Sequence, residues 1–266
     1  MNRFFKITVA AFLSLGVTTA VHAAGDAPVP PSKGWSFEGV FGKFDKQSAQ
    51  RGFQVYSEVC AGCHGLQLVA YRNLMELGYS EEQVKTYAAQ FEVSAIDDDG
   101  ETITKPATPA HKFVPPFPNV KAAAASNGGK APPDLSLMTK KRMHGPDYVY
   151  ALLTGYAESP SAEWLAKYEE DHGKAFEQSE TLYFNEYFGG YQIAMAPPLL
   201  DEGVSYEDGT AATVDQQAKD VVQFLTWAAE PELEVRKAMG FKVMIYLVIL
   251  LGLFVYLKRK VWSDLH

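Results

Sequence analysis

The chain has little cysteine, and its only two, Cys60 and Cys63, stand close together among 266 residues. Two cysteines leave no second pair to complete a four-cysteine zinc site. Positive charge is also scarce, because 24 lysines and arginines face 32 acidic residues and the net charge is −8. Nucleic-acid phosphates need a basic surface, so this balance argues against a nucleic-acid partner and favours encounter with a basic one.

Long apolar runs are confined to the two ends of the chain, and the first has the form of an export signal. Arg3 and Lys6 precede an apolar run over 7–17, and the segment 21–23 fits a cleavage site. The run is short for a membrane anchor, which is the alternative interpretation. We therefore expect residues 1–23 to be a signal peptide and the mature chain to be exported.

The second apolar run, residues 241–257, is just long enough to cross a bilayer, which needs about 17–25 residues. Lysine and arginine follow at once at 258–260, and positive residues stay on the cytoplasmic side of a membrane. A buried core helix is the alternative, but the basic flank argues against it. The predicted order is a signal peptide (1–23), an exported periplasmic domain (24–238), a transmembrane anchor (239–257) and a cytoplasmic tail (258–266).

The motif Cys60-Ala61-Gly62-Cys63-His64 has the Cys-x-x-Cys-His form of a covalent haem c attachment site. Thiols at this spacing lie on one face of a helical turn, where both can add to the vinyl groups of one haem. The histidine then meets the iron from the proximal side. The alternatives are a thioredoxin-like redox pair, half of a zinc site or a structural disulfide, and no βαβ pattern surrounds the cysteines to favour the first.

Hydrophobic periodicity predicts several individual helices. Apolar residues recur at helical spacing through 51–66, so one helix should end in the cysteine motif with its buried face toward the haem. A proline-rich stretch over 97–133 has no such pattern, and we expect it to wrap a cofactor. The other segments with helical patterns are 72–77, 81–91, 147–156 and 214–229.

The sixth ligand of the iron decides which reactions the haem can carry out. If a second protein side chain fills that position, the iron can only pass electrons. Met195 is the favoured candidate, since it lies between a Gly-Gly pair and Pro197-Pro198, which stiffen the loop. Met138 and Met143 are competitors, although Met138 has the position of a core residue. The loop histidines that leave bis-histidine ligation open are His111, His144 and His172.

Several further segments form one ordered set with the cysteine motif. They are Arg51-Gly52-Phe53-Gln54-Val55-Tyr56, Pro132-Pro133-Asp134-Leu135-Ser136, Asp147-Tyr148, Leu152-Leu153-Thr154-Gly155-Tyr156, Ala194-Met195-Ala196-Pro197-Pro198-Leu199 and Trp227-Ala228-Ala229-Glu230-Pro231. In order and spacing they resemble the cytochrome c1 family, the haem c subunits of ubiquinol–cytochrome c oxidoreductase, in its alphaproteobacterial form. The resemblance covers nearly the whole mature chain and is much more specific than the cysteine motif alone.

The resemblance implies a class I cytochrome c core, mainly α, with long inserted loops and one C-terminal transmembrane helix. The helix over 51–66 should cross that over 214–229. Some bacterial relatives carry an extra cysteine pair that forms a disulfide in the loops before the methionine ligand, and this chain has none. Packing of the aromatic residues in 183–191 would then have to position Met195.

The same resemblance implies one haem c, held covalently through Cys60 and Cys63, with His64 and Met195 as axial ligands. The planar guanidinium of Arg142 suits a haem propionate and matches the family's propionate-contacting arginine, with a plain surface arginine as the alternative. The remaining residues in haem-lining segments are Asn127, Pro133 and Tyr148.

The function implied is one-electron transfer from the Rieske iron–sulfur protein to a soluble or tethered periplasmic cytochrome c. It would take place in a complex of the bacterial inner membrane that also contains a b-type cytochrome, and the complex as a whole would be the enzyme. The acidic stretches 97–101 and 158–186 would dock a basic cytochrome c, with a merely solvated surface as the alternative. The rival functions are a free-standing tethered carrier and a catalytic or gas-sensing haem protein.

Overall fold

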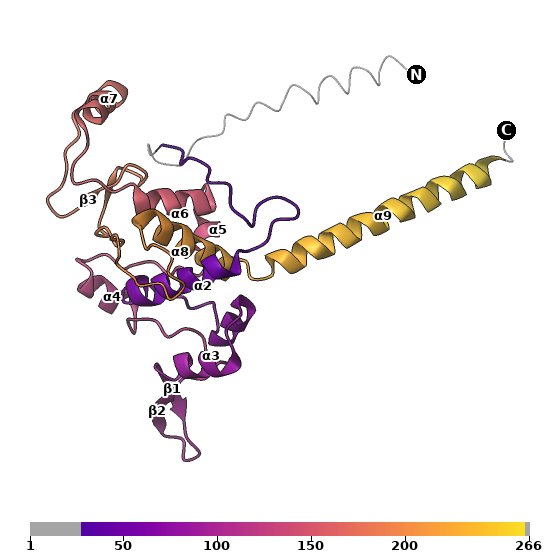
Figure 1. The fold of residues 1–266 in the computed structure, drawn as a ribbon, viewed down its shortest axis with the longest axis horizontal. Helices are drawn as coiled ribbons and strands as arrows, with labels where there is room; N and C mark the ends of the chain where they lie inside the picture. The colour runs from indigo at the N-terminus through magenta and orange to yellow at the C-terminus, as the bar shows by residue number, and fades with distance from the viewer. Residues whose placement is uncertain (1–27, 264–266) are drawn as a thin grey trace.

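The computed structural model describes residues 28–263, so the predicted signal peptide lies outside the described residues. The described part is mainly helical, as the resemblance implied, and its C-terminal helix projects from the rest (Figure 1). The helices are α2 (Lys46–Val55), the π-helical turn η1 (Tyr56–Cys60), the 3₁₀ helix η2 (Tyr71–Leu77), α3 (Glu81–Ala88), α4 (Val120–Ser126), α5 (Met138–Lys141), α6 (Gly145–Thr154), α7 (Ala162–His172), α8 (Val214–Ala229) and α9 (Leu233–Trp262). The strands pair as the antiparallel hairpins β1 (Glu92–Ile96) with β2 (Thr102–Pro106) and β3 (Tyr183–Phe184) with β4 (Gln192–Ile193).

Helices α2 and α8 cross at the centre of the fold, and α5 and α6 pack against α8. Gly52 makes the crossing close, because a Cβ atom at this position would lie 1.9 Å from the carbonyl oxygen of Asp220. Only glycine lets the two backbones approach so closely. The helix that leads to the cysteine motif is thereby fixed against the most deeply buried helix of the domain.

Asp220 is a fully buried carboxylate at the same crossing. Arg51 meets it with two N–H groups, Nε to Oδ2 at 2.9 Å and Nη2 to Oδ1 at 3.1 Å. Ser48 donates its hydroxyl to Oδ1 at 2.6 Å, and Gln216 donates Nε2–H to Oδ2 at 3.0 Å. The hydrogen bond to Asp220 is the largest cause of the raised pKa of Arg51. The buried negative charge is therefore fully paired.

Asp220→Ala should lower the free energy of unfolding by about 3 kcal/mol, because it removes the main partner of a largely buried arginine. Asp208 provides the matched control, since it accepts from Nη1 of the same Arg51 at 2.8 Å but is exposed. Asp208→Ala should leave the unfolding midpoint nearly unchanged, because exposed pairs contribute little. Urea unfolding followed by circular dichroism measures both variants, and equal midpoints would contradict a stabilising role for the buried pair.

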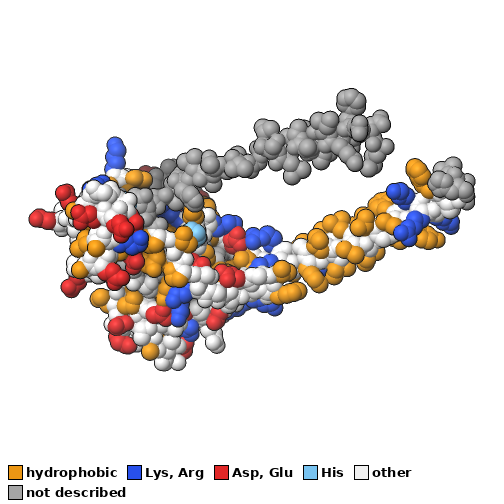
Figure 2. Space-filling view, turned by 90° about the horizontal axis from the view of Figure 1, so that it is seen from above, with side chains coloured by type: hydrophobic (Ala, Val, Ile, Leu, Met, Phe, Trp, Pro, Cys, Tyr) orange, Lys and Arg blue, Asp and Glu red, His pale blue; other side chains and the backbone are white. Residues whose placement is uncertain are grey.

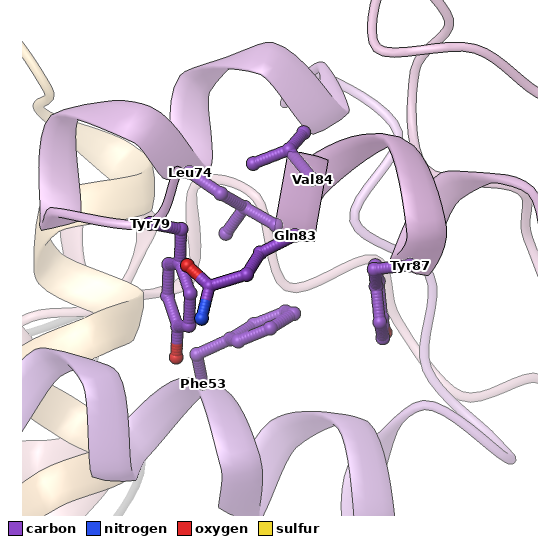
Figure 3. Close-up of a pocket in the computed structure, with 6 residues that line it drawn as sticks. All are labelled: Phe53, Leu74, Tyr79, Gln83, Val84 and Tyr87. Carbon is purple, nitrogen blue, oxygen red and sulfur yellow. The ribbon is translucent and has the colours of Figure 1, made fainter. Parts of the chain in front are cut away.

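An aromatic cluster holds η2 and α3 against α2. Phe53 lies between Tyr79 and Tyr87 in edge-on contacts, with ring centroids 5.5 and 5.0 Å away (Figure 3). The six residues in Figure 3 line a hollow of about 130 Å³. Burial raises the pKa of Tyr79 to about 12, so its hydroxyl stays protonated. The cluster packs η2 and α3 against the helix that carries the cysteine motif, and Phe53 also contacts Phe224 of α8, with ring centroids 5.5 Å apart.

The stretch 97–133 is more regular than the sequence predicted. Its first part completes a β-hairpin, in which Ile96 of β1 faces Thr102 of β2. Farther on, Asn119 caps α4 by accepting the N–H of Ala122 at 2.9 Å. The expectation of an irregular stretch was wrong here because β2 is exposed at all five residues, so it lacks the apolar alternation that reveals a half-buried strand.

Helix α9 runs without a break from the folded domain through the apolar run. Its 30 residues span about 45 Å, against about 30 Å of hydrocarbon in a bilayer. It is the one helix in the described part that is long and apolar enough to cross a membrane, and none of its apolar window is buried. An apolar helix exposed in this way needs lipid or another membrane helix as cover.

The link between α8 and α9 consists of residues 230–232, and ion pairs connect it to two helices. The Glu230 carboxylate pairs with Lys140 of α5 at 2.5 Å and with Arg236 of α9 at 2.7 Å. Burial raises the pKa of Glu230, but the two cations outweigh burial and lower it overall. The carboxylate therefore stays charged and holds α9 to the domain.

Candidate haem c site

Helix α2 differs from the predicted helix 51–66 at both ends. It begins earlier, because Asp45 caps it by accepting the N–H groups of Gln47 and Ser48 at 3.1 and 3.2 Å. The polar first turn carries no apolar stripe, so periodicity could not place the start. At the other end the helical turns stop at Cys60, and the prediction that they continue was wrong.

The chain leaves the helix through the π-helical turn η1. The N–H of Ala61 donates to the carbonyl of Tyr56 at 2.8 Å, five residues back, which widens the last turn. The N–H groups of Cys63 and His64 then both donate to the carbonyl of Cys60, at 3.1 and 2.9 Å. π-Helical turns inside helices are frequent at functional sites. Both thiols and the imidazole are thus gathered in one compact turn at the end of a buried helix.

One hydrogen bond decides the tautomer of His64. Nδ1 lies 2.7 Å from the carbonyl oxygen of Pro133, and a carbonyl oxygen can only accept, so Nδ1 carries the proton. Nε2 then has a free lone pair, which is the form in which histidine binds a metal. Burial lowers the pKa of His64 more than the bond to Pro133 raises it, and this also favours the neutral ring.

The segment 132–136 lies alongside 65–68 and keeps the Pro133 carbonyl in place. The bonds between the two segments are Leu135 N–H to Gly65 O (2.9 Å), Gln67 N–H to Asp134 Oδ2 (2.8 Å) and Leu68 N–H to Ser136 Oγ (3.0 Å). Apart from Pro133, the residues of these two segments were not predicted from the sequence as part of the site. The one local signal was the aspartate after two prolines, a residue type that closes turns by binding nearby backbone N–H groups.

The thiols of Cys60 and Cys63 are free. Burial raises the pKa of Cys60 to about 12. A thioredoxin-like pair relies on a thiol of lowered pKa, so these surroundings argue against that alternative. Within residues 28–263 no cluster of three or more His, Cys, Asp or Glu side chains could hold a metal ion. Both sulfurs remain available for thioether bonds.

Met195 and the competing methionines differ in their surroundings. It is half-buried, and the hydroxyl of Tyr156 donates to its backbone carbonyl at 3.1 Å. Burial raises the pKa of Tyr156, so this hydroxyl stays a donor. Met138 is 9% exposed in the hydrophobic core, whereas Met143 is 58% exposed at the surface. Met138 is thus committed to packing, and sequence reasoning missed the positioning contact from Tyr156.

Aromatic packing fixes the chain just before the methionine. In the β3–β4 hairpin Tyr183 faces Ile193. Trp164 of α7 contacts the rings of Phe184 and Tyr191 edge-on, each with centroids 4.9 Å apart. Tyr191 has φ of 61°, a left-handed conformation that a bulky residue adopts only where its surroundings hold it. Packing of this kind is what the sequence predicts in place of the missing disulfide.

The loop histidines have local roles in the structure. His111 accepts the N–H of Thr108 at Nδ1, at 3.0 Å. His172 donates from Nδ1 to the carbonyl of Tyr168 at 2.9 Å, and the two rings stack with centroids 4.0 Å apart. His144 is exposed and precedes α6 with φ of 62°. These contacts favour structural roles for His111 and His172 over iron ligation.

Arg142 and Tyr148 are neighbours on the predicted propionate side. Burial raises the pKa of Tyr148, and the positive charge of Arg142 acts in the opposite direction. Arg142 is exposed, and none of the residues described in the structure forms an ion pair with its guanidinium. Asn127 ends α4, where its Nδ2–H donates to the carbonyl of Ala123 at 2.7 Å. A guanidinium without an acidic partner beside a protonated phenol suits an anionic group.

A family model described as the cytochrome C1 family matches residues 35–265. The chain belongs to the cytochrome c1 family. It is 49% identical over 263 residues to cytochrome c1 of Rhodospirillum rubrum, which is 97% of each chain. It is 44% identical over 270 residues to cytochrome b/c1 of Bradyrhizobium diazoefficiens, covering 98% of this chain and 39% of that one. It is 42% identical over 258 residues to a mitochondrial cytochrome c1 heme protein of Arabidopsis thaliana, covering 97% of this chain and 80% of that one.

Membership of the cytochrome c1 family confirms the resemblance read from the sequence, and the donor groups fit haem c. Two free thiols stand beside an imidazole whose Nε2 is unprotonated, and a half-buried methionine lies on a supported loop. Among the predicted site residues, the structure brings His64 into contact with Pro133 and places Arg142 near Tyr148. Within the described chain no hydrogen bond joins Met195 to another predicted site residue.

Proposed function

We propose that this chain carries one covalent haem c and passes electrons singly from the Rieske iron–sulfur protein to a periplasmic cytochrome c. It does so as a subunit of a ubiquinol–cytochrome c oxidoreductase. The observation that carries the proposal is the imidazole of His64, fixed through Nδ1 with its Nε2 lone pair free at the end of the cysteine turn. Family membership supports the same conclusion.

When bound, haem c supplies reversible one-electron chemistry. Cys60 and Cys63 would hold it through thioethers, and His64 and Met195 would provide the axial ligands. The carbonyl bonded to Nδ1 keeps Nε2 of His64 as the ligating nitrogen, and the hydroxyl of Tyr156 steadies the loop that presents the thioether. With two protein side chains binding the iron, His64 and Met195 would leave no open position for a substrate, and the chain would only relay electrons.

The proposed propionate contacts involve Arg142 and Tyr148. The guanidinium offers paired N–H donors to a carboxylate. The phenol of Tyr148 stays protonated because burial raises its pKa, so it can donate a further hydrogen bond. Asn127 and Pro133 complete the proposed lining.

The relatives' names support the proposed assembly. In one of them, cytochrome b/c1, the matching part is 39% of a longer chain. A b-type cytochrome is therefore the proposed membrane partner of α9. The proposed topology places 24–238 in the periplasm, 239–257 in the inner membrane with its lipid, and 258–266 in the cytoplasm.

Purification of the membrane complex tests the proposal. The chain should keep its haem on a denaturing gel, and Cys60→Ser with Cys63→Ser should abolish that covalent attachment. We expect b-type haem and an iron–sulfur cluster to copurify, and the reduced haem c to leave carbon monoxide unbound at neutral pH. Purification as a single haem protein would indicate a free-standing carrier, and ready carbon monoxide binding would indicate a catalytic or gas-sensing protein.

The acidic helix α7, which stands out from the domain (Figure 1), is the proposed docking surface for a basic cytochrome c. Asp171 pairs with Lys167 at 2.8 Å, so Glu169 and Glu170 are the better probes. Glu169→Lys with Glu170→Lys should lower the rate of cytochrome c reduction at low salt about threefold to tenfold and flatten its salt dependence.

The matched control for this docking surface is Glu82→Lys with Glu92→Lys, which reverses two exposed charges that have no ion pair within the described residues. It should leave the rate of cytochrome c reduction unchanged. Stopped-flow reduction at several ionic strengths measures both variants. An α7 variant with the native rate and salt dependence would remove α7 from the docking surface.

A further inference from the structure

The place where α9 leaves the domain is hollowed and basic. A pocket of about 300 Å³ lies between the loop 40–43 and the first turns of α9. Its walls combine apolar and basic side chains, chiefly Val40, Phe41, Lys43, Lys237, Phe241 and Lys242. The single carboxylate in the lining, Glu234, accepts the backbone N–H of Phe44 at 3.0 Å.

The loop lies at the level where the apolar run of α9 begins. The rings of Phe41 and Phe241 meet edge-on with centroids 5.9 Å apart, and Phe241 is the first residue of the run 241–257. Phe41 is 78% exposed and Val40 is 66% exposed. Aromatic and apolar side chains at this level of a membrane protein enter the headgroup region. With α9 across a membrane, the loop would form a second contact between the domain and lipid.

The lysines of this pocket are opposite in sign to the net charge of the whole chain, which is −8. Basic side chains stand at both ends of the apolar helix (Figure 2). Lys237 closes the loop, since its ammonium donates to the carbonyls of Phe37 at 2.5 Å and Gly42 at 3.2 Å. Lys43 and Lys242 are exposed, and neither ammonium has a hydrogen bond or an ion pair to any residue that the structure describes. Basic pockets beside a membrane helix attract anionic headgroups.

We propose that this pocket binds the headgroup phosphate of an anionic phospholipid, taken from the leaflet on the side of the folded domain. Lys43 and Lys242 bind the phosphate oxygens, and Lys237 adds its charge while it keeps the loop closed. The acyl chain follows the faces of Phe41 and Phe241 into the bilayer. The proposal depends on α9 crossing the membrane and is independent of the electron-transfer function.

The test uses the full chain in its membrane complex, in nanodiscs of phosphatidylcholine. One sample contains photoactivatable phosphatidylglycerol, a second contains photoactivatable phosphatidylcholine, and mass spectrometry locates the cross-linked peptides. We expect the anionic probe to label 40–43 and 237–242 in preference to the neutral one. Lys43→Gln with Lys242→Gln should lower that preference about fivefold for each charge removed.

The matched control is Lys258→Gln with Lys260→Gln, which removes two charges from the other end of α9 and should leave labelling of 40–43 unchanged. An unaltered haem spectrum shows that each variant is folded. Equal labelling by the two probes would overturn the proposal, as would an unchanged preference in Lys43→Gln with Lys242→Gln. A photoreactive phenylalanine analogue at position 41 that cross-links to a protein chain instead of lipid would show that a protein covers the pocket.

Discussion

Met195→Leu should lower the midpoint potential of the bound haem by on the order of 0.1–0.3 V, within the about 0.8 V range that axial ligands span. Leucine keeps the apolar bulk but has no sulfur donor, so the ligand that raises the potential is lost. The bond from Tyr156 reaches the backbone carbonyl of residue 195 and survives the change, so the loop keeps its anchor. The weak near-infrared band of the oxidised protein should disappear, and an optical redox titration gives the potential.

Tyr156→Phe is the matched variant for this experiment. It removes the hydroxyl that donates to the Met195 carbonyl at 3.1 Å but leaves the thioether in place. We expect the near-infrared band to remain and the potential to move much less than in Met195→Leu. If Met195→Leu kept the native spectrum and potential, another residue would hold the iron, and Met138, Met143 and the loop histidines would become the candidates.

Gly52→Ala should destabilise the domain by about 3 kcal/mol, at the upper end of the usual cost of adding atoms to a packed core. The new Cβ would lie 1.9 Å from the carbonyl oxygen of Asp220 and 2.8 Å from Cβ of Phe224, and backbone atoms cannot swing aside as a long side chain can. Helices α2 and α8 would have to separate, which would also loosen the pairing of Arg51 with Asp220. Urea unfolding and the yield of covalent haem measure the effect.

Gly240→Ala is the control, because it makes the same exchange inside α9, where an added Cβ has no atom within 4 Å. Alanine is favoured over glycine inside a helix by about 1 kcal/mol, so intrinsic propensity would stabilise both variants. At Gly52 the steric contact at the helix crossing should outweigh this propensity and make the substitution destabilising, whereas Gly240→Ala should be stabilising. Two variants of equal stability would mean that α2 and α8 lie farther apart than the structure places them.

The helices could be predicted from the sequence where one face is apolar over several turns. Helix α8 spans Val214–Ala229 as predicted. Its buried face is long, so the spacing of its apolar residues matches only the period of a helix. The start of α2 could not be predicted, since its first turn is polar and is set by the cap at Asp45. The hairpin of β1 and β2 was missed because β2 is exposed along its whole length and has no hydrophobic pattern.

The parts of the site also differ in how far they could be predicted from the sequence. The cysteine turn could be found because the chemistry of attachment dictates a fixed local spacing. The contact between His64 and Pro133 joins residues 69 positions apart, and the bond from Tyr156 to Met195 joins residues 39 apart. No local pattern encodes such bonds, so the segments could be recognised but the bonds between them could not.

The link between α8 and α9 is short and is held by ion pairs, so it restricts the position of the folded domain relative to α9. Only residues 230–232 separate the two helices, and Glu230 pairs with Lys140 on one flank and Arg236 on the other. These contacts restrict the motion of the domain relative to α9, so the proposed haem would stay at a nearly constant height above the membrane that α9 is proposed to cross. If the proposed function holds, electrons would pass through the domain only at that height, and the proposed electron donor and acceptor would have to move to reach it.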